Sequence, residues 1–492
     1  MTFLKDKSAP ALKPASHDPL TPPALMSFMT ERWQKPSGKK PPKVEGLARF
    51  QARRNALSKM FPGELLVIPT GHEKVRANDT HYPFRPGTDF YYLTGNVEAD
   101  CVLVLEPTVS GHKHVLYVEP NPGKTDATFF TDRVKGELWV GPRLGVPESA
   151  HRFGVDECRP IKQLVESLAK VAKSKATRVL PGFSRLAEQG FRTAKSRTEE
   201  RDRALAEALS EMRLCKDALE VKALEGAIDA TKRGFEDVIA RLSVAKSERE
   251  VEGVFFLRAR TEGNDVGYGT IAACGGHACT LHWTKNDGAV KKGDMLLLDA
   301  GVESNTLYTA DITRCLPVTG KFSREQRLVY ELVLDAQKQA MEEVKPGNHF
   351  LDPNRRAMKV LTQGLVRMGI LKCSVDEAMA PEKQLYRRYT LHNVSHMLGL
   401  DVHDCAKARS ETYKFGKLLP GMVLTIEPGL YFQPDDLTVP SAFRGIGVRI
   451  EDDVLVTKTG YRNLSAHIPR ETKDVEAWMR SVWAGQKKSR RA

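Results

Sequence analysis

The second half of the sequence mixes helical periodicity with short β-branched or aliphatic runs, and this pattern limits the fold more than any other feature. From residue 214 to residue 242, apolar residues recur at nearly helical intervals, which predicts a long amphipathic helix. Four runs bounded by turn residues predict strands at 295–298, 312–318, 423–426 and 447–456. Because helices and strands do not alternate strictly, the pattern predicts an α+β domain, with helices over a largely antiparallel sheet.

Two of the expected helices carry their own boundary signals. Ser247 with Glu250 predicts a capping box at the start of one helix, and Gly263 is expected to close that helix in the left-handed conformation. Ser323 with Gln326 repeats the start signal for a second helix.

The length of the chain predicts two domains, since 492 residues exceed the range of about 100–200 residues that is usual for one domain. A helix at 47–60 and strands at 65–68, 101–105 and 114–118 give the first half an α/β character. The predicted division is an extended or disordered arm at 1–45, an α/β domain at 46–200, the α+β domain at 201–470 and a basic tail at 471–492.

The sequence predicts a cytoplasmic protein. No run of about 18 apolar residues is present, and the first residues, MTFLKDKSAPALKP, lack the apolar core of a secretory signal. The eight cysteines are scattered without any CxxC pair, which indicates thiols in a reducing compartment and neither disulfides nor a zinc knuckle.

The net charge of +13 does not point to nucleic acid once it is located. The first 48 residues hold eight Lys and Arg against four Asp and Glu, and the last six residues hold four basic residues. The body of the chain therefore has only a small surplus, and we interpret the basic ends as solvated segments.

Five residues at the ends of the predicted strands could bind metal. They are Asp299, Asp311, His396, Glu427 and Glu451. Each alone is compatible with an ordinary turn or strand end, but together they supply oxygen ligands and one nitrogen, which suit Mn²⁺, Co²⁺ or Zn²⁺. Converging carboxylates would repel one another, and two divalent ions would neutralise them. Such a pair can hold a bridging hydroxide as the nucleophile for hydrolysis.

Three further histidines, His282, His392 and His403, occur near these candidate ligands or between them in the sequence. A lone histidine is more often a polar core residue than a functional one. Three around one candidate ligand favour function, because an imidazole beside metal ions can hold a carbonyl oxygen or donate a proton to a departing amine.

Six strings in order resemble the motifs of aminopeptidase P and prolidase, the proline-specific branch of the pita-bread metallopeptidases. They are LHWTKND, LLLDAGVE, LYTADITRCLPV, LHNVSHMLGLDVHD, LTIEPGLYF and GVRIEDDVLV. Upstream, FRPGTDFYYLTGNVEADCVLVL resembles the N-terminal domain of aminopeptidase P. The resemblance covers residues 46–470 and implies a C-terminal pita-bread catalytic domain preceded by a smaller α/β domain.

The resemblance also implies a role for each of the five ligands. Asp299 would bind one metal ion, and Asp311 and Glu451 would bridge both. His396 and Glu427 would bind the other ion, with Glu427 also accepting a proton from the attacking water. Asp299 and Asp311 lie twelve residues apart, one more than in many members of the family. We expect the extra residue to lie in a hairpin turn or bulge within VESNTLYTA.

The remaining implied roles concern catalysis and substrate binding. His403 would stabilise the scissile carbonyl or the tetrahedral intermediate, and His282 and His392 would line the substrate pocket. Arg449 would brace the carboxylates, and Tyr431 is a further pocket candidate.

The implied function is a metal-dependent aminopeptidase that releases the first residue of a peptide with proline in the second position. It would use two divalent ions, with Mn²⁺ preferred over Co²⁺ or Zn²⁺, in a dimer or tetramer. Two alternatives remain, a prolidase-type dipeptidase and an inactive pita-bread module that binds peptides.

Overall fold

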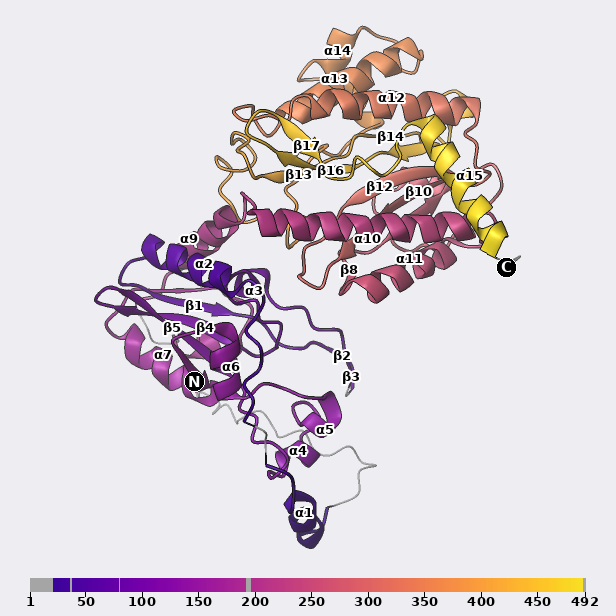
Figure 1. Ribbon diagram of the computed structural model, residues 1–492. Coiled ribbons are helices and arrows are strands. Elements are labelled where there is room, and N and C mark those ends of the chain that lie inside the picture. Colours follow the sequence, from indigo (N-terminus) through magenta and orange to yellow (C-terminus); the bar gives the residue numbers. More distant parts are fainter. Residues whose placement is uncertain (1–20, 36–37, 79, 192–195, 490–492) are drawn as a thin grey trace, which may run out of the picture. The chain divides into compact units, whose positions relative to one another are not determined.

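The computed structural model describes residues 21–35, 38–78, 80–191 and 196–489 (Figure 1). The chain divides into two compact units, Met1–Asp202 and Arg203–Ala492, and each has its own core. Among the described residues, no helix is both long enough and apolar enough to cross a membrane.

A five-stranded mixed sheet forms the centre of the first unit. Its order is β6-β5-β4-β1-β7, in which β1 pairs antiparallel with β4 and parallel with β7. The strands are β1 (Leu65–Pro69), β4 (Val102–Thr108), β5 (Gly111–Val118), β6 (Glu157–Pro160) and β7 (Thr177–Val179). A separate small ribbon is formed by β2 (Val75–Ala77) and β3 (Thr80–His81).

Helices cover both faces of this sheet. Alternate strand residues, such as Leu65 and Val67, pack with Leu164 and Leu168 on one face. The helices of the unit are α1 (Pro23–Thr30), α2 (Leu47–Met60), α3 (Thr88–Thr94), α4 (Thr128–Thr131), α5 (Glu137–Val140), α6 (Val146–Phe153), η1 (Ile161–Gln163), α7 (Leu164–Ala172), α8 (Arg185–Gln189) and the start of α9 (Glu199–Met212). The predicted α/β character of this half is confirmed.

Four helices enclose the strands of the second unit. In Figure 1, α10 and α11 lie on one side of the strands, and α12 and α13 lie on the other. The helices are α10 (Ala218–Leu242), α11 (Glu248–Glu262), α12 (Arg324–Met341), α13 (Asp352–Arg367), α14 (Val375–Met379) and α15 (Thr472–Ser489), with 3₁₀ turns η2 (Gly275–Cys279), η3 (Leu385–Arg388) and η4 (Ser441–Phe443). Ser323 and Gln326 form the expected capping box of α12.

The strands of the second unit pair antiparallel throughout the described residues, as predicted. They are β8 (Asp265–Val266), β9 (Ile271–Cys274), β10 (Met295–Ala300), β11 (Val302–Glu303), β12 (Ile312–Pro317), β13 (Val423–Ile426), β14 (Gly429–Tyr431), β15 (Gly447–Arg449), β16 (Asp452–Val456) and β17 (Tyr461–Asn463). The two three-stranded sheets have the orders β12-β10-β9 and β13-β16-β17. The run predicted as one strand at 447–456 is thus two strands, β15 and β16, with Glu451 at the break between them.

The boundary signals of α11 are only partly as predicted. Ser247 caps the helix by accepting from the Glu250 N–H, but the Glu250 carboxylate binds Arg241 and the Lys246 N–H, so the capping box is incomplete. Gly263 has φ −127° and is not left-handed. A Cβ at Gly263 would lie 2.4 Å from the Glu303 carbonyl oxygen, so close backbone approach explains the glycine.

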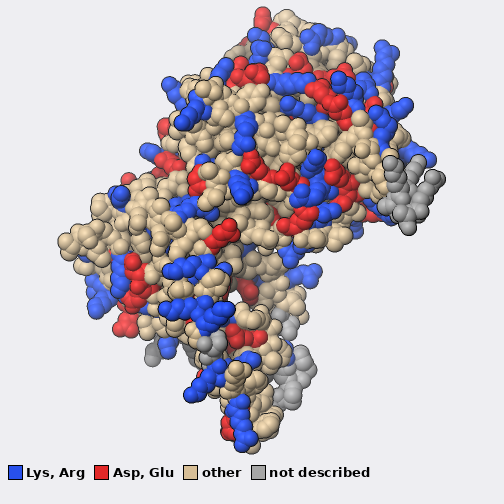
Figure 2. Space-filling view, viewed as in Figure 1, with Lys and Arg blue, Asp and Glu red and all other residues tan. Residues whose placement is uncertain are grey.

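Both predicted end segments contain helix. Residues 23–30 form α1 within the predicted arm, while residues 1–20 lie outside the described part. Residues 472–489 form α15 within the predicted tail. Val475, Trp478 and Met479 are buried at helical spacing, which anchors α15 in the second unit. On the face shown in Figure 2, basic and acidic side chains are interspersed and do not form one basic surface.

Candidate metal centre

Strand pairing brings the first two candidate ligands together. Asp299 lies opposite Thr313 in the β10–β12 pair, so Asp311, just before β12, lies at the same end of the sheet. The chain between them folds back as a hairpin. The Ser304 N–H donates to the Tyr308 carbonyl at 2.9 Å, and Leu307 adopts φ 62° in the turn. The expected hairpin turn therefore lies within VESNTLYTA, and it accommodates the twelve-residue spacing.

A second antiparallel pair positions the two glutamates. Ile426 of β13 lies opposite Asp452 of β16, so continuing the register by one residue places Glu427 opposite Glu451. Both carboxylates are thus carried at strand ends, where the backbone is held by the sheet.

His396 reaches the same place from an irregular segment that runs beside β13. The Thr425 N–H donates to the His396 carbonyl at 3.0 Å, and Met397 bridges to Leu424. On the ring, Nδ1 contacts the Met397 carbonyl oxygen at 3.2 Å. Because that oxygen can only accept, Nδ1 carries the proton, and Nε2 is left to bind other groups.

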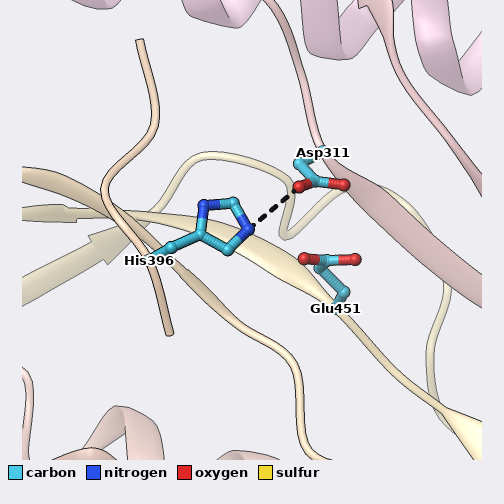
Figure 3. Close-up of side chains that lie close together, drawn as sticks. All are labelled: Asp311, His396 and Glu451. Carbon is cyan, nitrogen blue, oxygen red and sulfur yellow. Dashed lines mark ion pairs between the residues drawn. The ribbon is translucent and has the colours of Figure 1, made fainter. Parts of the chain in front are cut away.

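Three of the five predicted ligands form a compact group. Ligand atoms of Asp311, His396 and Glu451 all lie within 4.8 Å of one another, and their side chains point toward a common centre (Figure 3). His396 Nε2 lies 3.2 Å from Asp311 Oδ2 and 3.5 Å from Glu427 Oε1. Asp299 lines the same cavity of about 580 Å³, together with the other four.

The electrostatics of the cavity fit bound cations. Burial and the neighbouring acidic groups raise the pKa of Glu427 to about 7 and that of Glu451 well above its usual range. Burial opposes protonation of His396, but the hydrogen bond to Asp311 and the charge of Glu427 outweigh it, so the pKa of His396 is raised to about 9. Burial also raises the pKa of Asp299. The four carboxylates and His396 form a donor set of hard oxygen atoms and one nitrogen that suits divalent metal ions.

Several side chains that are not candidate ligands brace the carboxylates, and sequence reasoning found only Arg449 among them. Arg449 donates to Asp299 Oδ2 at 2.5 Å, as the predicted bracing role requires. The Tyr268 hydroxyl lies 2.7 Å from Asp299 Oδ1 and 2.5 Å from Asp311 Oδ1. The Thr313 hydroxyl donates to Glu451 Oε2 at 2.6 Å. The string DVGYGT around Tyr268 carries no metal-site signal, so only the three-dimensional structure could find this residue.

The three predicted pocket histidines all line the cavity. The ring of His403 packs edge-on against that of His396, with a centroid distance of 4.3 Å. Burial and the Arg449 charge lower the pKa of His392 to about 4, so this imidazole is neutral. Tyr431 is not among the residues that line the cavity, and its pocket role stays a prediction. Its hydroxyl lies behind the wall, bonded to His392 Nε2 at 2.8 Å and to Arg449 at 3.0 Å.

Comparisons with known proteins agree with this geometry. The model of metallopeptidase family M24 matches residues 222–458, and that of the aminopeptidase P N-terminal domain matches residues 50–180. Xaa-Pro aminopeptidase 1 of Streptomyces coelicolor is 51% identical over 437 residues, which cover 88% of this chain and 87% of that protein.

Solved structures show the same likeness. Aminopeptidase P from Escherichia coli with the inhibitor Pro-Leu has a TM-score of 0.80 and 32% identity, covering 89% of this chain and 99% of that one. Zinc-substituted E. coli aminopeptidase P in complex with product has a TM-score of 0.79 with the same identity and coverage.

The fold and the cluster of buried ligands thus define a metal-dependent hydrolase of the pita-bread class. All five candidate ligands and the three pocket histidines lie within the residues that the M24 model matches. The chain belongs to the aminopeptidase P family, and it is a metal-dependent aminopeptidase.

Proposed function

We propose that this chain releases the first residue from peptides whose second residue is proline. The observation that carries the proposal is that one cavity is lined by all five potential metal ligands and by three further histidines. The similar Streptomyces and E. coli proteins are named for the same specificity, which supports the choice of substrate.

The five side chains that would hold two divalent ions are Asp299, Asp311, His396, Glu427 and Glu451. We propose Mn²⁺ as the natural ion, with Co²⁺ or Zn²⁺ as substitutes, because one imidazole among four carboxylates is a predominantly hard ligand set. When bound, such ions would polarise the substrate carbonyl and lower the pKa of water.

The chain's own residues supply the proton transfers and the orientation. Glu427 accepts the proton of the attacking water, because its carboxylate lines the cavity beside the other candidate ligands, 3.5 Å from His396 Nε2. His403 and His282 are exposed at the cavity, where their ring nitrogens can hold the carbonyl oxygen and the amide nitrogen. The neutral His392 also lines the cavity, but its two ring nitrogens are bonded to the Asn393 carbonyl and the Tyr431 hydroxyl. Arg449 and Tyr268 keep Asp299 in place.

Proline gives a physical reason for a dedicated pocket. A bond before proline has a tertiary amide nitrogen with no hydrogen to donate, and the ring excludes ordinary extended binding. A cavity with histidine edges can accept the ring while holding the free amino terminus near the carboxylates.

The test is hydrolysis of an Xaa-Pro-Yaa tripeptide and an Xaa-Pro dipeptide by the purified chain with added Mn²⁺. We expect release of the first residue from the tripeptide, and its loss in Asp311→Ala. Asp335→Ala, which removes an exposed acid on α12 that bonds Gln339, is the matched control and should stay active. Cleavage confined to the dipeptide would indicate a prolidase, and no cleavage of either peptide would contradict the proposal.

We also propose a cytoplasmic homo-oligomer, a dimer or tetramer. The cysteines are all free thiols, as a reducing compartment requires. Helix α1 has no buried residue and exposes Phe28, so it offers apolar surface to a second copy. Light scattering of the purified chain tests the assembly, and a monomer at micromolar concentration would contradict it.

A further inference from the structure

One buried glutamate outside the metal centre accepts four hydrogen bonds from a single loop. Glu248 is the first residue of α11, and its side chain is fully buried. Oε1 accepts from the Cys274 N–H at 2.8 Å and from His277 Nδ1 at 2.9 Å. Oε2 accepts from the Trp283 indole at 2.8 Å and from the Gly288 N–H at 2.7 Å. These donors span the beginning, middle and end of the loop at 274–288.

The backbone of Gly288 packs closely against this carboxylate and against His277. A Cβ at Gly288 would lie 2.5 Å from His277 Cε1 and 2.7 Å from Glu248 Oε2. The Glu248 N–H also donates to the Gly288 carbonyl at 2.9 Å. Because every donor around it points at a carboxylate, a neutral amide at Glu248 would place N–H groups against N–H groups.

The loop carries His282, and Trp283 is the connection between that histidine and Glu248. The Trp283 ring stacks on His277 at 3.9 Å with an interplanar angle of 27°, while its indole N–H binds Glu248. Two contacts thus fix the residue that directly follows His282. The His282 imidazole is exposed at the cavity and makes no hydrogen bond within the described part of the chain. Its position is therefore determined by the backbone of the loop.

We propose that Glu248 is a positioning residue that holds His282 in the geometry needed to bind substrate. The inference rests on the proposed function of the cavity. Glu248 touches neither the cavity nor a metal ligand, so it acts through Trp283 and the loop backbone. A purely structural carboxylate would affect stability and metal content, whereas a positioning residue affects the step in which His282 takes part.

The test is a double-mutant cycle between Glu248→Gln and His282→Ala, measured on an Xaa-Pro-Yaa peptide with saturating Mn²⁺. We expect E248Q to lower kcat/KM by between about tenfold and 100-fold, because displacements near 1 Å have effects of that size. The loss in kcat/KM should be distributed between kcat and KM in the same proportion for E248Q as for H282A. In the H282A background, adding E248Q should change kcat/KM less than about twofold, since both substitutions remove the same interaction. Bound metal should stay equal to wild type.

Two further variants keep the test decisive. Glu250→Gln is the matched control, because this carboxylate lies on the same helix but binds Arg241 and the Lys246 N–H, away from the loop. It should leave both kinetic constants unchanged. If E248Q does not fold, Trp283→Phe replaces it, since phenylalanine keeps an aromatic ring beside His277 but loses the five-membered ring that carries the indole donor. Asn286, whose side chain binds Ala272 and Thr270, anchors the loop independently in either variant.

The outcomes separate this inference from the proposed function. Losses that multiply in the double mutant, or an E248Q enzyme with wild-type kinetics, would overturn the positioning role while leaving the peptidase activity intact. A wild-type chain that cleaves no Xaa-Pro peptide, or H282A with full activity, would overturn the proposed role of the cavity and this inference with it.

Discussion

At the scale of single residues, the candidate metal centre includes side chains that would bind no metal. The Tyr268 hydroxyl lies within hydrogen-bond distance of both Asp299 and Asp311. It has one hydrogen and donates to one carboxylate at a time, so it favours an arrangement in which the two oxygens remain close. Groups that orient ligands in this way raise metal affinity without coordinating the ion.

Tyr268→Phe removes this hydroxyl while keeping the ring. We expect Mn²⁺ affinity to fall by about tenfold to 100-fold, as is typical for such outer partners. Competition with a fluorescent chelator measures the change. Tyr308→Phe is the control, because the buried Tyr308 hydroxyl binds Glu220, which is not a ligand. Equal affinities in wild type and Y268F would contradict the bracing role.

At the scale of elements, one hairpin sets the distance between the two aspartates. Gly301 follows β10 directly, and its backbone faces Ala310 on the returning strand. A Cβ at Gly301 would lie 1.7 Å from the Ala310 carbonyl oxygen. Since that atom belongs to the backbone, the strands would have to separate, and Asp299 and Asp311 would move apart.

Gly301→Ala should therefore destabilise the second unit by about 1–3 kcal/mol, the usual effect of overpacking, and should weaken metal binding. Gly226→Ala is the opposite case, because this exposed position in α10 has open space around it. There we expect a gain of roughly 0.5–1 kcal/mol from helix propensity. Urea unfolding and metal titration of both variants test the pair of expectations, which would be wrong if G301A bound metal normally.

At the scale of the whole molecule, the candidate metal ligands are confined to one of the two compact units. Every candidate ligand lies in Arg203–Ala492, while Met1–Asp202 has a separate mixed sheet and its own hydrophobic core. A ligand stabilises the part of the chain that binds it, by an amount that grows with the ratio of its concentration to its dissociation constant.

Added Mn²⁺ should thus slow hydrogen exchange in β10, β12, β13 and β16, and removal of metal by a chelator should reverse the effect. At 100 times the dissociation constant the stabilisation is about 2.7 kcal/mol, or roughly a hundredfold slower exchange in the best protected amides. Strands β1, β4 and β5 should not respond. Peptide-resolved exchange measures this, with Asp311→Ala as the control. An equal slowing of hydrogen exchange in both units on addition of Mn²⁺ would contradict this prediction.

The sequence alone determined the α+β class and most of the strands, and it supplied the candidate ligands, because these follow from local patterns. Strand runs such as 423–426 are β-branched or aliphatic and bounded by turn residues, and Glu427 follows one of them directly. Helix α2 was predicted with the bounds that the structure has. Where local signals were weak, as in the predicted arm and tail, helices α1 and α15 were not predicted.

Only the tertiary structure decided which distant groups meet. Tyr268 and Thr313 brace the carboxylates through contacts that strand pairing creates, and nothing near them in the sequence marks this role. Tyr431 lies behind the cavity wall because the β14–β15 pairing places its hydroxyl between His392 and Arg449. The type of each residue can be read from the sequence. The residues that it contacts depend on how strands far apart in the sequence pair with one another.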